Sequence, residues 1–197
     1  MAHKLKEEKT LVLIKPDGIK RGLTGEILSR IEQRGLKVIA LKMFWATPEQ
    51  INDHYPKASE WITRLGHKTL GTYEKYGIDP LEELGTADPS EIGKMVRGWL
   101  IDFMTSGPLI KIIVQGVHAV DMVRKLCGNT LPNLAEMGTI RGDYSVDSPA
   151  LANAGRRAIH NIVHASETQE EAEHEIEFWF SSEEVHEYKR AEEDIMF

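Results

Sequence analysis

Short apolar runs alternate along the chain with stretches whose apolar residues recur every three or four positions. Four runs of strand length predict β-strands, at residues 11–14, 36–45, 109–114 and 159–163. Helical periodicity separates them, and the order contains the β-α-β spacing twice. We therefore predict a ferredoxin-like α/β sandwich (α+β), with a four-stranded antiparallel sheet covered by helices.

Helix starts and ends are marked by capping residues. Thr47 and Asp88 are each followed by Pro, which favours an N-cap with Pro at the first helical position. Gly35 is placed to end a helix over 23–31. The predicted helices are 23–31, a short one after Thr47, 92–103, 119–127, and one from Thr168 whose inward stripe is Ala172, Ile176 and Trp179.

Three stretches are less regular. Residues 56–87 hold several glycines among scattered aromatic residues, which predicts short helical pieces separated by turns. Residues 128–158 lack periodicity, and so long an irregular segment is typical of functional or disordered chain. At the C-terminal end, Ser181 and Glu184 have capping-box spacing ahead of Val185 and Tyr188, so we predict that the end of the chain is helical.

Composition narrows the class of protein. The 197 residues are 41% hydrophobic, which suits one domain over 1–197, and the formal charge of −7 disfavours nucleic acid as a main partner. A single cysteine, Cys127, allows no disulfide framework. Residues 1–9 lack the apolar core of a signal peptide, and no apolar run is long enough to cross a membrane, so we expect a cytoplasmic protein.

The chemistry converges on residues 158–167, where an apolar run ends at His164 and a helical pattern follows. Ser166 with Gln169, and Thr168 with Glu171, both have capping-box spacing. Glu175 lies beside the inward stripe, where a carboxylate needs a partner. If Glu175 accepts the imidazole N–H, the other nitrogen becomes an oriented nucleophile. The residues alone leave open a core histidine and a solvated Glu175.

Lys15 and Arg124 each allow a structural and a functional interpretation. Lys15 ends the first predicted strand before Pro16-Asp17-Gly18, so it either reaches a ligand or is solvated at the strand end. Arg124 lies near the end of a predicted helix, where it would also interact favourably with the helix dipole.

Several separate motifs together resemble the nucleoside diphosphate kinase family over residues 9–188. They are Lys15-Pro16-Asp17-Gly18, His54-Tyr55, Ser106-Gly107-Pro108, Arg124 with Gly128-Asn129-Thr130-Leu131-Pro132, Gly138-Thr139-Ile140-Arg141-Gly142-Asp143-Tyr144, Asn161-Ile162-Val163-His164-Ala165-Ser166-Glu167, and Glu175. The Gly-Thr-Ile-Arg-Gly-Asp run and the Asn-x-x-His-x-Ser segment are the most specific of these motifs.

The resemblance implies a phosphotransferase that works by a ping-pong reaction. His164 would take the γ-phosphoryl group of a nucleoside triphosphate, typically ATP, and pass it to a nucleoside diphosphate, and Glu175 would orient the imidazole. The nucleotide phosphates would bind Lys15, Tyr55, Arg124, Thr130 and Arg141, and Asn161 with Lys15 would hold the sugar hydroxyls. Mg²⁺ would be held mainly by the phosphates, and the assembly would be a homo-oligomer, hexameric or tetrameric.

The chain also departs from the family pattern. Ala165 stands where the family usually has Gly, which matters if that position needs a positive φ. Glu167 replaces the more common Asp. Two stretches are longer than usual, about 57–94 and 146–158, and we expect them to be insertions into the single domain. They displace the base-binding region, for which Val96 and Trp99 are candidates.

Other functions compete with this prediction. The chain could bind nucleotides without turnover, or carry phosphate on a histidine to a protein acceptor. Lost turnover is disfavoured by the retained set of Lys15, Arg124, Arg141, Asn161, His164 and Glu175. The sugar site implied by Asn161 favours nucleotides over a protein acceptor.

Overall fold

The computed structural model describes residues 7–191 and 193–196. In chain order the elements are β1 (Glu7–Ile14), α1 (Pro16–Lys20), α2 (Thr24–Gln33), β2 (Lys37–Phe44), α3 (Pro48–His54), α4 (Ser59–Tyr76), α5 (Pro80–Leu84), α6 (Pro89–Thr105), β3 (Leu109–Val117), α7 (Ala119–Cys127), η1 (Pro132–Leu134), α8 (Ile140–Tyr144), α9 (Pro149–Ala154), β4 (Val163–Ala165), α10 (Gln169–Trp179), η2 (Ser182–Glu184) and α11 (Glu193–Met196). No helix among the described residues has the length and apolar character to cross a membrane.

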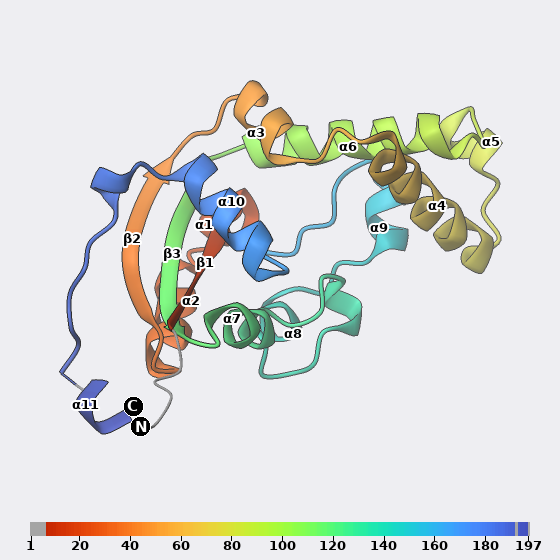
Figure 1. The fold of residues 1–197 in the computed structure, drawn as a ribbon. Coiled ribbons are helices and arrows are strands. Elements are labelled where there is room, and N and C mark those ends of the chain that lie inside the picture. Colours follow the sequence, from red (N-terminus) through yellow and green to blue (C-terminus); the bar gives the residue numbers. More distant parts are fainter. Residues whose placement is uncertain (1–6, 192, 197) are drawn as a thin grey trace.

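The four strands form one antiparallel sheet in the order β2-β3-β1-β4 (Figure 1). The predicted ferredoxin-like α+β architecture is therefore confirmed. Strand β1 lies inside the sheet and its residues from Thr10 to Ile14 are all buried. This explains its continuous apolar run, because a strand covered on both faces has no solvent-facing side to alternate with.

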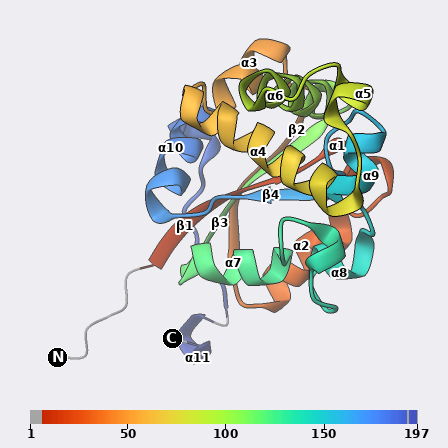
Figure 2. The ribbon, with the colours of Figure 1, turned by 90° about the vertical axis from the view of Figure 1, so that its right-hand side faces the viewer.

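The two faces of the sheet bury separate cores. Val12 and Ile14 of β1 pack with α2, α7 and α8 residues, whereas Leu11 and Leu13 pack with residues of α3, α6 and α10. Successive side chains of a strand point to opposite faces, so both cores share one strand. In Figure 2, α4 and α6 lie on one side of β4, and α7 and α8 lie on the other.

The fourth strand differs from its prediction at residues 159–163. Strand β4 is Val163–Ala165, so His164 lies within it, opposite Leu13 of β1. The preceding Ile162 has a φ of 70°, which interrupts extended pairing. A positive φ at a β-branched residue costs about 1–3 kcal/mol and persists only where its surroundings hold it.

The segment 56–87 also differs from its prediction, because α4 is one helix of 18 residues. Gly66 and Gly71 lie inside it without breaking it. A Cβ on Gly66 would lie 1.8 Å from the Pro89 carbonyl oxygen, and one on Gly93 would lie 1.9 Å from that of Ile62. The glycines therefore mark a close crossing of α4 and α6 instead of turns.

The two remaining irregular stretches differ from each other in secondary structure. Residues 128–158 contain three short helices, η1, α8 and α9. The predicted helical C-terminal end is wrong for residues 185–191 and holds only for the 3-10 turn η2, where the Ser181–Glu184 capping box forms, and for the short α11. From there the chain runs along the outer side of β2 (Figure 1), where the His186 backbone N–H donates to Ile39 O at 2.9 Å. Pairing with the free edge of β2 replaces intrahelical bonds in this segment.

Candidate active site

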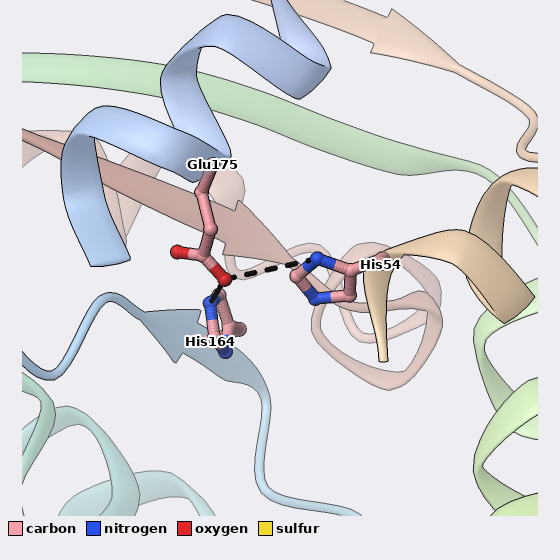
Figure 3. Close-up of side chains that lie close together, drawn as sticks. All are labelled: His54, His164 and Glu175. Atoms are coloured by element: carbon pink, nitrogen blue, oxygen red, sulfur yellow. Dashed lines mark hydrogen bonds and ion pairs between the residues drawn. The ribbon is translucent and has the colours of Figure 1, made fainter. Parts of the chain in front are cut away.

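At the centre of the candidate site, an imidazole is hydrogen-bonded to a buried carboxylate. His164 Nε2 lies 2.7 Å from Glu175 Oε1, with His164 on β4 and Glu175 on α10 (Figure 3). Because an ionised carboxylate only accepts, Nε2 carries the proton and Nδ1 keeps a free lone pair. The sequence prediction of an oriented His164–Glu175 pair agrees with this geometry.

The carboxylate has a second fixed partner. Ser166 Oγ donates to Glu175 Oε2 at 2.6 Å and accepts the Leu11 backbone N–H at 3.3 Å. Burial acts to raise the pKa of Glu175, but the hydrogen bond and charge of His164 and the bond from Ser166 lower it, and the lowering prevails. Glu175 is therefore an ionised acceptor even though it is only 5% exposed.

Ser166 does not have the predicted capping role. Thr168 is the N-cap of α10, accepting the Glu171 N–H at 3.1 Å, and the Ser166 hydroxyl is committed to Glu175. The two-residue spacing between His164 and Ser166 could have indicated this role. Ser166 lies two residues after His164, and residues two apart on a strand share a face.

His54 adds a second imidazole to the group, and sequence reasoning gave it no role. Its Nδ1 lies 3.7 Å from Glu175 Oε1 and accepts the Trp179 Nε1–H at 3.3 Å, which leaves its own proton on Nε2. Burial, together with the nearby charge of His164, lowers the pKa of His54 to about 3, so it stays neutral.

Tyr55 follows His54 at the end of α3. The ring centroids of these two residues are 5.1 Å apart, and Tyr55 stacks on Trp61 at 6.1 Å. Burial raises the pKa of Tyr55, with a smaller contribution from the charge of Glu175, so its hydroxyl stays protonated. The structure therefore brings Tyr55 to the predicted active site.

Lys15 and Asn161 contact each other directly. Lys15 Nζ donates to Asn161 Oδ1 at 2.7 Å, and Asn161 Nδ2 donates to the Thr130 carbonyl at 2.9 Å. Burial, followed by the charge of Arg141, lowers the pKa of Lys15 to about 8. Lys15 is 8% exposed, so it is not a solvated lysine at a strand end.

Arg141 is buried and binds backbone carbonyls at three of its nitrogens. Nε donates to Asn161 O at 3.2 Å, Nη1 to Gly128 O at 2.6 Å and Nη2 to Val163 O at 2.8 Å. A guanidinium has five N–H donors, so two remain for a ligand. Burial lowers the pKa of Arg141 from its very high ordinary value.

A cavity of about 200 Å³ collects three of the predicted phosphate-binding residues. Its lining consists of Arg124, Cys127, Gly128, Asn129, Thr130, Arg141 and Ala165. Arg124 also lies 3.6 Å from the exposed Glu167 carboxylate, in addition to its place near the end of α7. Two arginines at one cavity create a site for an anion.

Two sequence questions concerned the backbone at Ala165 and the position of Trp99. Among the described residues, the non-glycine positions with positive φ are His118, Arg156 and Ile162, so alanine is unstrained at 165. Trp99 is not brought to the cavity of Arg124. It lines a separate hollow of about 240 Å³ with Asp102, Phe103, Ser106, Arg156, Arg157, Ala158 and His160.

One group in the described part of the chain has the composition of a metal site. The candidate ligand atoms of His54, His164 and Glu175 lie within 4.8 Å of one another (Figure 3). Mg²⁺ prefers oxygen ligands, and this group offers two imidazoles and one carboxylate. The donor set therefore does not suit Mg²⁺ held by protein side chains alone.

Comparisons with known proteins give the family. The Nucleoside diphosphate kinase family model matches residues 8–62 and 90–185, which leaves 63–89 between the two matched parts. A nucleoside diphosphate kinase from Pyrobaculum aerophilum is 52% identical over 178 residues, covering 90% of this chain and 97% of that protein.

Two solved structures are also similar. A crystal structure of an NDP kinase from Pyrobaculum aerophilum has a TM-score of 0.89 at 50% identity, covering 92% of this chain and 100% of that one. A nucleoside-diphosphate kinase from Borrelia burgdorferi, with bound vanadate and ADP as a transition state mimic, has a TM-score of 0.75 at 35% identity and covers 95% of each chain. The chain therefore belongs to the nucleoside diphosphate kinase family and is a nucleotide-binding phosphotransferase.

Proposed function

We propose that His164 is the residue that carries the phosphoryl group between nucleotides in this nucleoside diphosphate kinase. The observation that carries the proposal is the 2.7 Å hydrogen bond from His164 Nε2 to Glu175, which leaves Nδ1 as the free nucleophile. In the first half-reaction, Nδ1 forms a bond to the γ-phosphorus as the bond to the leaving diphosphate oxygen breaks. The diphosphate departs with the electron pair, and the Nε2 proton stays on the ring.

The second half-reaction reverses these changes with a different acceptor. A terminal oxygen of the incoming nucleoside diphosphate attacks phosphorus, and the N–P bond breaks to restore the neutral imidazole. The ring is most positive while phosphorylated, so the ionised Glu175 stabilises that state. No net proton transfer is needed, which suits a histidine whose second nitrogen is already committed.

The cationic groups would neutralise the transferring group. We assign the phosphates to Lys15, Tyr55, Arg124, Thr130 and Arg141, of which Arg124, Thr130 and Arg141 line one cavity. Phosphoryl transfer depends mainly on positioning and on neutralising charge over the equatorial oxygens, which these groups supply. Asn161 and Lys15 would hold the sugar hydroxyls, and their 2.7 Å contact supports a shared ligand.

Mg²⁺ is proposed as the cofactor, bound through the nucleotide phosphates. When bound, it would neutralise charge on the phosphate oxygens and orient them. This assignment fits the imidazole-rich donor set near His164, which is a poor match for Mg²⁺. Trp99 stays only a prediction as a base-contacting residue, because its hollow is separate from the cavity of Arg124.

We also propose that the chain works as a homo-oligomer, a hexamer or a tetramer. The exposed apolar residues Leu41, Met43 and Trp45, which are 48%, 56% and 65% exposed, support a subunit contact near β2. Light scattering after gel filtration measures the assembly, and a monomeric mass contradicts it. A single domain over 1–197 with insertions at about 57–94 and 146–158, and a cytoplasmic location, stay predictions.

The test of the function follows labelled phosphate through both half-reactions. Purified protein is incubated with Mg-ATP labelled at the γ-position, separated from nucleotide, and then given GDP or dTDP. We expect an acid-labile label that is absent from His164→Asn and discharged by either diphosphate. Nucleotide binding without label would favour a binding protein, and a label that resists every diphosphate would favour a phosphocarrier.

A further inference from the structure

The backbone between Asn161 and His164 is unusual. Ile162 has a φ of 70°, and the Val163 N–H donates to Asn161 O at 2.7 Å, which closes a three-residue γ-turn. Turns of this kind with a positive φ at the central residue are rare and strained. A strained turn persists only where neighbouring groups hold it, so its hydrogen-bond partners identify what maintains it.

The turn sets the position of two groups of the proposed mechanism. Asn161 begins it and contacts Lys15 through its side chain, and Val163 ends it and leads directly into His164. A change in the backbone of Ile162 would therefore move both the sugar-binding amide and the nucleophile. Phosphoryl transfer is sensitive to such movement, because it depends mainly on alignment.

Two side chains and one backbone N–H from other parts of the chain hold the turn. Asp17 Oδ2 accepts the Ile162 N–H at 3.0 Å, across 145 residues of sequence, and the Lys15 N–H donates to Ile162 O at 2.8 Å. Arg141 donates to the carbonyls on either side, those of Asn161 and Val163. The Ile162 N–H and the carbonyl oxygens of Asn161, Ile162 and Val163 therefore all bond to groups outside the turn.

Asp17 is the member of this set that the mechanism has not used. Its other oxygen, Oδ1, is buried without a hydrogen-bond partner in the described part of the chain. Asp17 is half-buried, and a buried carboxylate oxygen without a hydrogen bond is costly, so a role confined to its own turn of α1 explains it poorly. The neighbouring Gly18 packs against the same residue, since a Cβ there would lie 3.0 Å from Ile162 Cγ2 and 3.2 Å from its carbonyl oxygen.

We propose that Asp17 is a positioning residue of the phosphoryl transfer, whose carboxylate holds the strained turn at Ile162 and thereby aligns Asn161 and His164. The proposal rests on the function proposed for His164. The carboxylate does not touch the reacting atoms, and it acts through the backbone.

The charge of Asp17 has a second consequence at Lys15. Burial and Arg141 lower the pKa of Lys15 to about 8, whereas Asp17 and, less strongly, Cys127 raise it. The other groups near the ammonium are Asn161 and the neutral His54. Removing the charge of Asp17 would lower the pKa of Lys15 further, so the loss of activity at alkaline pH would begin at a lower pH.

The test separates these effects with four variants. Asp17→Ala removes the acceptor, and we expect kcat to fall by at least about tenfold, since small misplacements cost this much or more. Adding Ile162→Gly to Asp17→Ala should restore kcat to within about threefold of Ile162→Gly alone, because glycine adopts a positive φ without strain. Asp17→Asn keeps an acceptor oxygen without the charge, and should move the alkaline limb of the pH profile to lower pH.

The matched control is Asp147→Asn. Asp147 is a buried carboxylate that accepts a backbone N–H of the same segment, that of His160 at 2.7 Å, but its bonds go to Ser148, Arg157 and His160 and not to the turn at Ile162. We expect it to lower the melting temperature without changing kcat. The proposal is wrong if Asp17→Ala keeps kcat within twofold, if Ile162→Gly gives no rescue, or if the Asp17→Asn profile is unmoved. Labelling of His164 by ATP in the same preparations keeps the proposed function standing in those cases, and its absence from the unmodified protein would overturn both.

Discussion

The segment 161–166 and the paired helices α4 and α6 are held together by different kinds of contact. Residues 161–166 are held by polar bonds from the junction of β1 and α1 and from α1, α8 and α10, with Lys15, Asp17, Arg141 and Glu175 as the partners. Helices α4 and α6 approach through Gly66 and Gly93, where backbone meets backbone. In the first region hydrogen bonds position the residues of the candidate site, whereas in the second the two helices are held by close packing. Changes in the first should therefore affect rate, and changes in the second should affect stability.

The largest expected effect on rate comes from Glu175→Gln. The amide keeps the shape but loses the charge that stabilises the phosphorylated ring, so kcat should fall by roughly 10²–10³-fold, as for other lost electrostatic stabilisers. Rapid-mixing measurement of His164 labelling checks this. A variant with unchanged kcat would show that the 2.7 Å contact is structural, and chemical denaturation controls for stability.

In the helix pair, Gly66→Ala should lower the free energy of unfolding by about 1–3 kcal/mol, because its Cβ would meet the Pro89 carbonyl. Gly71→Ala is the matched control in the same helix. No atom lies within 4 Å of its Cβ, so it should be neutral or stabilise by up to about 1 kcal/mol. Urea unfolding measures both free energies. If Gly66→Ala lowered kcat as much as Glu175→Gln does, the two regions would not differ in the way described.

The pH dependence sharpens the role of Lys15. Its pKa is lowered from 10.5 to about 8, so the ammonium is present below that pH and is lost as pH rises through it. Above pH 8, kcat/KM should fall by roughly tenfold per unit, following the charged fraction. Lys15→Arg is the control, since a guanidinium stays charged and should remove this limb of the profile. A flat profile to pH 10 in the unmodified protein would contradict the assignment.

The smallest effect is expected for Ala165→Gly. Ala165 is a β4 residue paired with Val12 and has no positive φ. Glycine should therefore only add backbone flexibility, which lowers the free energy of unfolding by about 0.5–1 kcal/mol. Activity should stay within twofold. A large gain in kcat would instead mean that alanine restrains the loop after His164, and thermal unfolding with kinetics at saturating nucleotide decides between these outcomes.

The sequence alone determined the strands that are buried on both faces and the helices with clear caps. The residues alone left open whether His164 and Glu175 form a pair, and the resemblance to the nucleoside diphosphate kinase family favoured the pair. Local pattern misread the segments where distant groups act. Gly66 and Gly71 indicate turns by local pattern, although the close approach of Pro89 is the reason for Gly66. The apolar run 159–163 likewise predicts a strand, although Asp17 holds Ile162 in a turn.

Only the tertiary structure decided which nitrogen of His164 is free, that Ser166 serves Glu175, and that Asp17 reaches Ile162. Each depends on a tertiary contact: Glu175 of α10 bonds to His164 and Ser166, eleven and nine positions away, and Asp17 bonds to Ile162, 145 positions away. Hydrophobic periodicity reports which face of an element is buried, because burial acts on every turn of a helix or pleat of a strand. It carries no information about which polar group lies opposite, since a single hydrogen bond leaves no repeat in the sequence.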